Sequence, residues 1–158
     1  MTGESIGRMK TWKVKWFTEL TAAELYEILR ARSEIFVVEQ SCVYQDIDGK
    51  DPEALHVFCE EDGRVTACLR AFREDEGLVR MGRVLTLKHG TGLGGELLKK
   101  GLKEIRERMA PQRIRIEAQT YAAGFYEREG FHVTSEEFME DGIPHVEMIL
   151  ECGTCLGF

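Results

Sequence analysis

The chain has 158 residues, 43% of them hydrophobic and 31% charged, and its 21 basic and 28 acidic residues give a net charge of −7. This composition is typical of a single globular domain, and the acidic balance argues against a general nucleic-acid-binding protein, which needs a basic surface. No apolar run approaches the roughly 18 residues of a membrane span, and residues 1–8 lack the apolar core of a signal peptide, so we expect a cytoplasmic protein without a membrane partner.

The first elements predicted along the chain are a strand and a capped helix. From Trp12 to Phe17 the residues alternate between apolar and polar, as in a half-buried strand. Thr21, with Glu24 three positions on, predicts a capping box for a helix that extends to about Ser33. A short apolar helical stretch at residues 35–38 follows.

Two acidic stretches, residues 34–53 and 136–141, are open to two interpretations. Each is either a solvated loop or a surface that attracts a cation. Asp46-Ile-Asp-Gly49 hints at a calcium loop, but an EF-hand would need Asp or Asn at Tyr44 and Glu at Leu55. We therefore predict no metal site here.

A glycine-rich turn divides the second half of the chain. Glu61-Asp-Gly-Arg64 is a strong hairpin signal, so antiparallel strands precede this turn. The strand at residues 113–119 returns through a helix and is therefore expected to run parallel to the strand before the glycines. The predicted elements are strands at 54–60, 65–73 and 78–87, a helix that ends before Pro111, a strand at 113–119, a helix at 121–129 and strands at 131–134 and 145–150.

The glycine turn, Gly90-Thr-Gly-Leu-Gly-Gly95, lies between a strand and a helix and is suited to binding a phosphate. Glycine allows positive φ and close approach of a ligand, and the first N–H groups of a helix lack intrahelical acceptors. A dinucleotide-binding oxidoreductase is one alternative, because Gly90, Gly92 and Gly95 also satisfy G-x-G-x-x-G. That fold requires an acidic residue about 20 positions on, whereas the next acidic strand residue, Glu117, is 27 positions past Gly90.

The ends of the chain are expected to lie outside the folded unit. Residues 1–10 are predicted to be a disordered lead-in, residues 11–151 a single domain and residues 152–158 a C-terminal tail. The five cysteines lack the spacing of a disulfide scaffold. Cys152-Gly-Thr-Cys155 lies in the tail, without a second pair for zinc or a following helix that would lower a thiol pKa.

The order of these elements resembles that of the GNAT superfamily of acyl-CoA-dependent N-acetyltransferases, with the glycine turn after the fourth strand and Phe125-Tyr-Glu-Arg-Glu-Gly-Phe131 after the fifth. The resemblance implies an α/β (α+β) fold whose mixed central sheet has about six or seven strands, flanked by about four helices and splayed between strands 4 and 5. A closer resemblance, to the ElaA-type branch, is carried by Phe36-Val-Val-Glu-Gln40, Cys42, Tyr44, Asp48, Asp51, His56, Ala118-Gln119 and Glu140-Asp-Gly-Ile-Pro-His145.

The resemblance also implies acetyl-CoA as cosubstrate, with its pyrophosphate on the amides of the glycine turn and its pantetheine arm along the fourth strand. His89 departs from the Gln or Arg that is usual in the family at the start of the loop. The cofactor-binding residues implied in this way are Val84, Leu85, Thr86, His89, Gly90, Thr91, Gly92, Leu93, Gly94, Gly95, Gln119 and Tyr126.

For catalysis, Tyr126 matches the family's general acid, which protonates the departing thiolate. Glu39 and His145 are the first candidates for the base, since both lie in segments of the ElaA-type match, and Glu117 and His56 are further candidates. The acidic stretches favour a cationic primary amine as acceptor. A catalytically silent GNAT protein that senses acetyl-CoA remains an alternative, and the sequence leaves the oligomeric state open.

Overall fold

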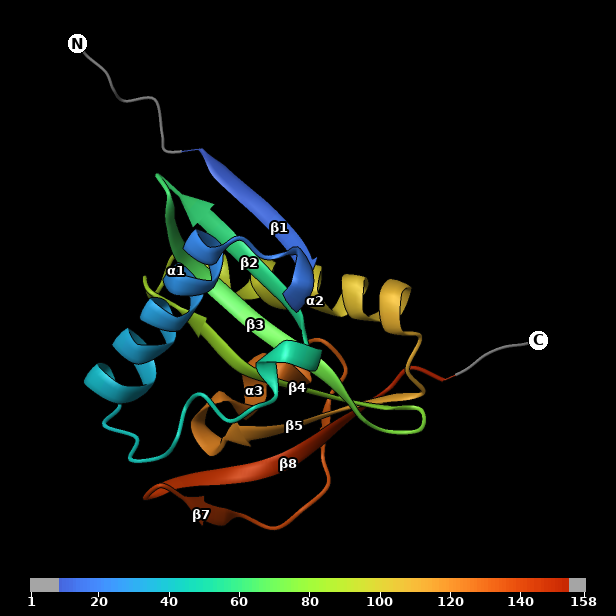
Figure 1. Ribbon diagram of the computed structural model, residues 1–158. Coiled ribbons are helices and arrows are strands. Elements are labelled where there is room, and N and C mark those ends of the chain that lie inside the picture. The colour runs from blue at the N-terminus through green and yellow to red at the C-terminus, as the bar shows by residue number, and fades with distance from the viewer. Residues whose placement is uncertain (1–8, 154–158) are drawn as a thin grey trace.

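The computed structural model describes residues 9–153, which form one eight-stranded mixed sheet with helices on both faces (Figure 1). The strand order is β1-β2-β3-β4-β5-β8-β6, and β7 pairs with β8. The predicted fold class is confirmed. The strands are β1 Lys10–Trp16, β2 Leu55–Glu61, β3 Arg64–Asp75, β4 Leu78–Thr86, β5 Arg113–Gln119, β6 His132–Val133, β7 Phe138–Glu140 and β8 Ile143–Glu151.

Among residues 9–153, three α-helices and one π-helical turn cover the sheet. α1 (Ala22–Arg32) begins with the predicted capping box, because the Thr21 hydroxyl accepts the Glu24 N–H at 3.0 Å and the Glu24 carboxylate accepts the Thr21 N–H at 2.9 Å. It continues directly into a π-helical turn, Ser33–Glu39. α2 (Leu93–Met109) ends before Pro111 as expected, and α3 (Ala123–Glu127) is shorter than the predicted helix because a 3-10 turn precedes it.

The core lies in two layers, one on each face of the sheet. α1 covers β3 and β4 from the front in Figure 1, where Ile28 and Phe36 pack on Phe58 and Leu85. α2 lies behind the sheet, and its apolar stripe is fully buried against β2, β3 and β4. Both helices therefore hold the middle strands in place, and the end of β4 leads directly into the glycine turn.

The sheet opens between β4 and β5, as the family resemblance implies. Leu78–Arg80 of β4 pair in parallel with Arg113–Arg115 of β5, and in the described chain β4 and β5 do not pair beyond Arg80. A bulge in β4 sets Arg83 and Val84 opposite Leu69 of β3, with Arg83 at φ +51°. Because a bulge bends its strand, β4 turns away from β5 and leaves a V-shaped opening.

The topology excludes the dinucleotide-binding alternative. Within residues 9–153, β4 and β5 run parallel, and the other strand pairs are antiparallel. A doubly wound fold requires several parallel units, so that hypothesis is wrong for this chain.

Strand β7 was not predicted. It forms a hairpin with β8, in which Glu140 pairs with Ile143 across Asp141 (φ +53°) and Gly142 (φ +75°). Asp-Gly with two positive φ values is a favoured two-residue hairpin turn, so the signal was present in a segment that was interpreted by its charge and its family resemblance and not as a turn.

Both chain ends lie partly outside the described residues. Most of the predicted lead-in, and Cys155 of the tail, lie outside residues 9–153. Lys10, the last residue of that lead-in, pairs with Glu61 at the start of β1. None of the described helices combines the length and the apolar character needed to cross a membrane.

Candidate active site

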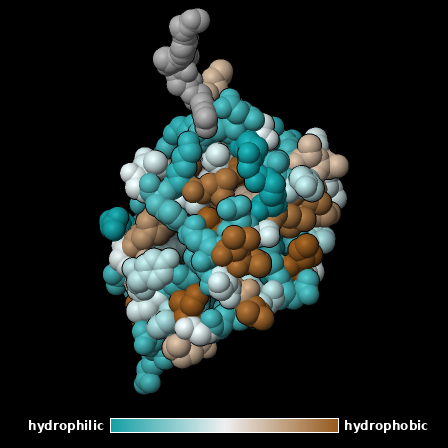
Figure 2. Space-filling model, turned by 90° about the vertical axis from the view of Figure 1, so that its left-hand side faces the viewer, coloured by the Kyte–Doolittle hydropathy of each residue, from teal (hydrophilic) through white to brown (hydrophobic). Residues whose placement is uncertain are grey.

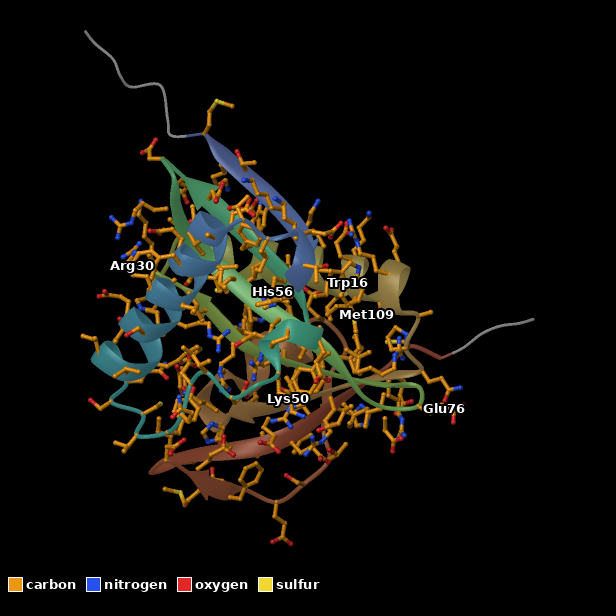
Figure 3. The ribbon with its side chains drawn as sticks, in the orientation of Figure 1. Trp16, Arg30, Lys50, His56, Glu76 and Met109 are labelled. Atoms are coloured by element: carbon orange, nitrogen blue, oxygen red, sulfur yellow. The ribbon has the colours of Figure 1, made fainter. Side chains whose placement is uncertain are left out.

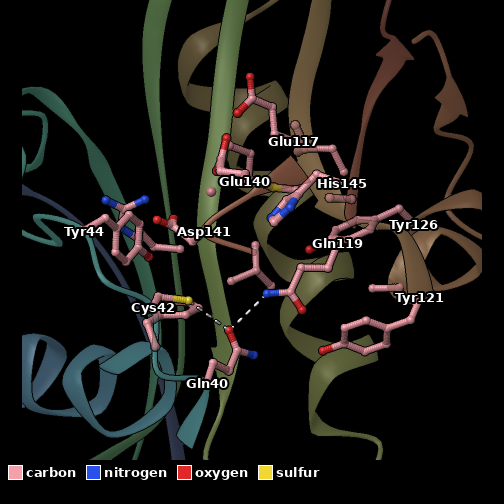
Figure 4. Close-up of a pocket in the computed structure, with 18 of the residues that line it drawn as sticks. Gln40, Cys42, Tyr44, Glu117, Gln119, Tyr121, Tyr126, Glu140, Asp141 and His145 are labelled. Carbon is pink, nitrogen blue, oxygen red and sulfur yellow. Dashed lines mark hydrogen bonds between the residues drawn. The ribbon is translucent and has the colours of Figure 1, made fainter. Parts of the chain in front are cut away.

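A cavity of about 180 Å³ lies where β4 and β5 separate (Figure 4). Its walls come from β4, β5, the β7–β8 hairpin, α3 with the 3-10 turn before it, and the π-helical turn with the segment after it, so residues far apart in the sequence meet there. Five of the candidate site residues singled out from the sequence line it: Val84, Glu117, Gln119, Tyr126 and His145.

Tyr126 is a buried residue of the cavity wall. It projects from α3 between Phe125 and Phe131, with ring centroids 5.0 and 5.8 Å away, and the residue is 8% exposed. Burial raises the pKa of the Tyr126 phenol well above its usual value. The phenol is therefore protonated at neutral pH and can donate a proton within the cavity.

His145 presents one defined ring nitrogen for chemistry. The residue is 7% exposed and stacks on Phe138 at 6.0 Å, and its Nδ1 lies 2.7 Å from the Ile143 carbonyl oxygen. A carbonyl only accepts hydrogen bonds, so Nδ1 carries the hydrogen and the neutral ring keeps a lone pair on Nε2. The backbone at the start of β8 thus fixes a tautomer that suits a base.

Two carboxyl groups, those of Glu117 and Glu140, lie beside His145 in Figure 4. Burial and the neighbouring Glu117 carboxylate, which shares a hydrogen bond with Glu140, raise the pKa of Glu140. Glu117 itself is held by Arg80 at 3.0 Å and Arg115 at 2.9 Å. Glu140 was not singled out from the sequence, although its position next to the Asp-Gly turn places it opposite the β8 strand that carries His145.

The segment after the π-helical turn crosses the mouth of the cavity. The Gln119 side-chain amide donates to the Gln40 side-chain oxygen at 3.0 Å, and Cys42 Sγ lies 3.8 Å from the same oxygen (Figure 4). Apolar side chains of the turn and of this segment point to solvent, with Val38 of the turn 68% and Val43 of the segment 90% exposed. Figure 2 views this side and shows apolar side chains in separate spots among polar ones.

Glu39 and His56, the other two candidate bases, do not line the cavity. Glu39 is half exposed, and its carboxylate accepts a hydrogen bond from His89 Nε2 at 3.2 Å. His56 is 1% exposed, and its Nε2–H donates to the Asp51 carbonyl at 3.0 Å. The structure therefore places Glu39 at the glycine turn and His56 in the core beneath the acidic loop.

The glycine turn has the features that a diphosphate requires. Gly90 and Gly92 have φ values of +74° and +82°, and a Cβ built at either one would meet no atom within 4 Å. At the start of α2, Leu93 N–H has a weak 3.4 Å bond to the Thr91 hydroxyl, and the N–H groups of Gly94 and Gly95 find no acceptor in the described chain. The residues present therefore fit an anionic, oxygen-rich ligand.

The edge of β4 that faces the opening is also unpaired. Leu87 N–H donates to the Thr66 carbonyl of β3 at 2.8 Å. Because successive backbone N–H groups of a strand point to opposite sides, the Thr86 N–H faces away from β3, toward the space that β5 has left. This edge can accept an extended ligand as an additional strand would.

The three aspartates of the first acidic stretch are neutralised by ion pairs within the protein, whereas its glutamates Glu34, Glu39 and Glu53 lie at exposed positions. Arginines from α1, β3 and β4 bind its aspartates. The ion pairs are Arg32 with Asp51 at 2.6 Å and Asp46 at 2.9 Å, Arg70 with Asp48 at 2.6 Å and Asp51 at 3.0 Å, and Arg83 with Asp46 at 2.8 Å and Asp48 at 3.3 Å. The acidic groups that line the cavity are instead Glu117, Glu140 and Asp141.

Comparison with known proteins agrees with this geometry. Residues 21–152 match the model of the acetyltransferase (GNAT) domain. A UPF0039 protein of Mycobacterium tuberculosis is 40% identical over 142 residues, which cover 85% of this chain and 88% of that protein. The crystal structure of an acyl-CoA N-acyltransferase from Pseudomonas aeruginosa has a TM-score of 0.84 at 35% identity, and the match covers 89% of this chain and 99% of that one.

The crystal structure of Escherichia coli ElaA is equally similar. It has a TM-score of 0.85 at 32% identity, over 90% of this chain and all of that one. The family model covers most of the sequence, and the relatives align over nearly their whole lengths. The chain therefore belongs to the GNAT family of N-acetyltransferases, in the branch that contains ElaA.

Proposed function

We propose that this enzyme transfers the acetyl group of acetyl-CoA to a cationic primary amine by direct attack. The observation that carries the proposal is a single cavity, open between β4 and β5, that contains the Tyr126 phenol and the Nε2 lone pair of His145. The glycine turn follows the same strand, β4, that forms one wall of this cavity.

The chain's own backbone supplies the groups that would hold acetyl-CoA. The free N–H groups of Gly94 and Gly95, at the N-terminus of α2, would bind the diphosphate, and the unpaired edge of β4 at Thr86 would bind the pantetheine amides. His89 and Thr91 flank the turn. When bound, the thioester supplies an electrophilic acetyl carbon and a thiolate leaving group.

His145 is the base in this proposal. An alkylammonium ion has a pKa near ~10, so the acceptor must lose a proton before its nitrogen can attack. Nε2 accepts that proton, while Nδ1–H keeps its bond to the Ile143 carbonyl and holds the ring in place.

Tyr126 is the acid in this proposal. Its phenol is buried against two aromatic rings and is protonated at neutral pH, so it can deliver a proton to a thiolate in the cavity. The Gln119–Gln40 hydrogen bond closes the cavity on the side of the π-helical turn. Gln119 thus acts in this proposal by fixing the wall beside the thioester.

Charge at the far end of the cavity supports a cationic acceptor. Glu140 and Asp141 of the β7–β8 hairpin line the cavity beside His145, and the described chain gives Asp141 no basic side chain as an ion-pair partner. An ammonium ion would be attracted to this end and presented to Nε2.

A catalytically silent acetyl-CoA sensor is the second candidate. The Glu39–His89 contact favours it, because the His89 imidazole, which flanks the glycine turn, is already hydrogen-bonded to the Glu39 carboxylate. Tight acetyl-CoA binding without acetylation of any amine would support this candidate over the first.

The test is an acetylation screen over polyamines, amino acids and peptides, read by mass spectrometry, with three variants measured on the best acceptor. Tyr126→Phe keeps the ring and its packing, and we expect a loss in kcat of about 100-fold or more with acetyl-CoA affinity unchanged. His145→Gln should lose at least as much and should lose the acidic limb of the pH profile. Full turnover in Tyr126→Phe, with chemistry limiting the rate, would refute the acid role.

A further inference from the structure

A second cavity of about 350 Å³ adjoins the first on the face of the sheet that α1 covers. The two share three wall residues of β4: Arg80, Gly82 and Arg83. The other residues of this second cavity, which we call the side pocket, are Asp48, Lys50, Glu53, Arg70, Phe72, Arg73 and Glu74.

The charge of the side pocket is opposite to that of the protein as a whole. Its lining contains five cationic side chains and three carboxylates, in a chain whose net charge is −7. Most of these charges are paired: Asp48 binds Arg70 at 2.6 Å and Glu74 binds Arg115 at 3.0 Å, and Arg80 and Arg83 bind carboxylates outside the lining, those of Glu117 and Asp46. The third carboxylate of the lining, Glu53, lies at an exposed position.

Two of the cations have no carboxylate partner among the described residues. Lys50 Nζ lies 5.6 Å from the centroid of the Phe72 ring and makes no ion pair there. The Arg73 guanidinium donates to the Met109 carbonyl at 2.6 Å. Figure 3 shows Lys50 on the loop in front of the sheet, on the same side as α1. The side pocket therefore keeps positive charge that the protein itself does not neutralise.

Gly82 lines both cavities and has no side chain that could separate them. A Cβ built there meets no atom within 4 Å, and the residue is not one of the glycines with positive φ. A larger residue would therefore be accepted by the backbone and would project into the space between the cavities.

We propose that the acceptor carries a carboxylate, which binds in the side pocket near Lys50 while its amine reaches His145 in the first cavity. The proposal rests on the proposed acetyl transfer. The two cavities together have an acidic end, at Glu140 and Asp141, and a cationic end, at Lys50 and Arg73. This arrangement is complementary to a zwitterion such as a free amino acid or the C-terminal residue of a short peptide, and it disfavours a simple polyamine.

The experiment compares three probes that share one alkylamine chain: L-lysine with a carboxylate, L-lysinamide with a neutral amide, and cadaverine with neither. Calorimetric binding to the protein saturated with coenzyme A is measured first, and acetylation with acetyl-CoA second. We expect L-lysine to bind about tenfold more tightly than either analogue, since one charge-assisted contact contributes roughly this factor. Equal binding of all three, tighter binding of cadaverine, or no binding of any would overturn the proposal.

Two variants locate the carboxylate. Lys50→Gln and Gly82→Leu should remove the preference for L-lysine over cadaverine, whereas Lys103→Gln, a surface lysine of α2 paired with Glu107, should leave it unchanged. A preference that survives in both Lys50→Gln and Gly82→Leu would also overturn the proposal. Selective binding without acetylation in the wild type would instead show that the proposed transfer fails while the carboxylate site stands.

Discussion

Replacement of Arg32 by methionine tests whether the acidic loop is held by buried charge. The Arg32 side chain is 1% exposed, and its guanidinium makes three contacts with the loop: Nη1 to Asp51 at 2.6 Å, Nε to the Asp46 carboxylate at 2.9 Å and Nη2 to the Asp46 carbonyl at 2.8 Å. Methionine has a similar length but no donors. Asp51, whose side chain is 6% exposed, would keep only the Arg70 contact at 3.0 Å.

The expected loss of stability follows from this burial. Removing one partner of a buried ion pair leaves an incompletely compensated charge and typically destabilises by about 3–5 kcal/mol. Arg70 still neutralises part of the charge on Asp51, so we expect the lower end, about 3 kcal/mol, which corresponds to roughly 6–12 °C in Tm for a domain of this size. The same loop leads from Gln40 to the side pocket, so the KM for the acceptor should rise while the KM for acetyl-CoA changes little.

Arg30→Met is the matched control, because it makes the same substitution on the same helix. Arg30 lies at the outer edge of α1 (Figure 3), and its ion pair with Glu27 leaves its side chain 27% exposed. Such a surface pair contributes up to about 1 kcal/mol. Urea unfolding of the two variants measures the difference, and a loss in Arg32→Met no greater than in Arg30→Met would refute the argument.

Two further predictions follow from other charged contacts. Glu39→Gln removes the carboxylate that is 3.2 Å from His89. We expect the KM for acetyl-CoA to fall about two- to fivefold, because a negative charge that repels the anionic ligand is removed. A roughly 100-fold fall in kcat would instead identify Glu39 as the base. Burial would raise the pKa of Glu24, but bonds from Lys13 and Lys15 lower it from 4.5 to about 2, so the stability that Glu24 contributes is complete above pH 4.5 and is lost as the pH falls toward 2. Denaturant unfolding of Glu24→Gln and wild type should accordingly differ by about 3 kcal/mol at pH 6 and converge near pH 2; a constant difference across this range would contradict the assignment.

Local signals predicted those parts of the fold that depend on neighbours in sequence. The capping box at Thr21 and the alternation in β5 required only residues within one element, and both were found where expected. The positive φ values of Gly90 and Gly92 follow from the same local chemistry. The splay between β4 and β5 came from the family resemblance, since its physical cause, a bulge at Arg83, leaves no mark in the periodicity of β4.

The acidic loop shows where sequence reasoning ends. Residues 39–53 contain a single lysine and several carboxylates, so this stretch has an excess of negative charge in the sequence. The arginines that neutralise its aspartates belong to three other elements. Arg32, Arg70 and Arg83 are far apart in sequence and converge only once α1 is packed on β3 and β4. A charge run is therefore informative about a surface only after its long-range partners are known.

The placement of Glu39 has a further physical reason, which lies in the π-helical turn. The Gln40 N–H donates to the Ile35 carbonyl at 2.9 Å, a five-residue spacing in place of the usual four. An α-helix advances by roughly 100° per residue and the wider turn by roughly 80°, so three residues carry Glu39 to about 120° from Phe36 where an α-helix would leave about 60°. Phe36 and Gln40 consequently line the cavity, and Glu39 turns toward His89 at the glycine loop. The wider turn thus separates Glu39 from its neighbour Gln40, and of the two first candidates for the base, Glu39 and His145, His145 alone lines the cavity.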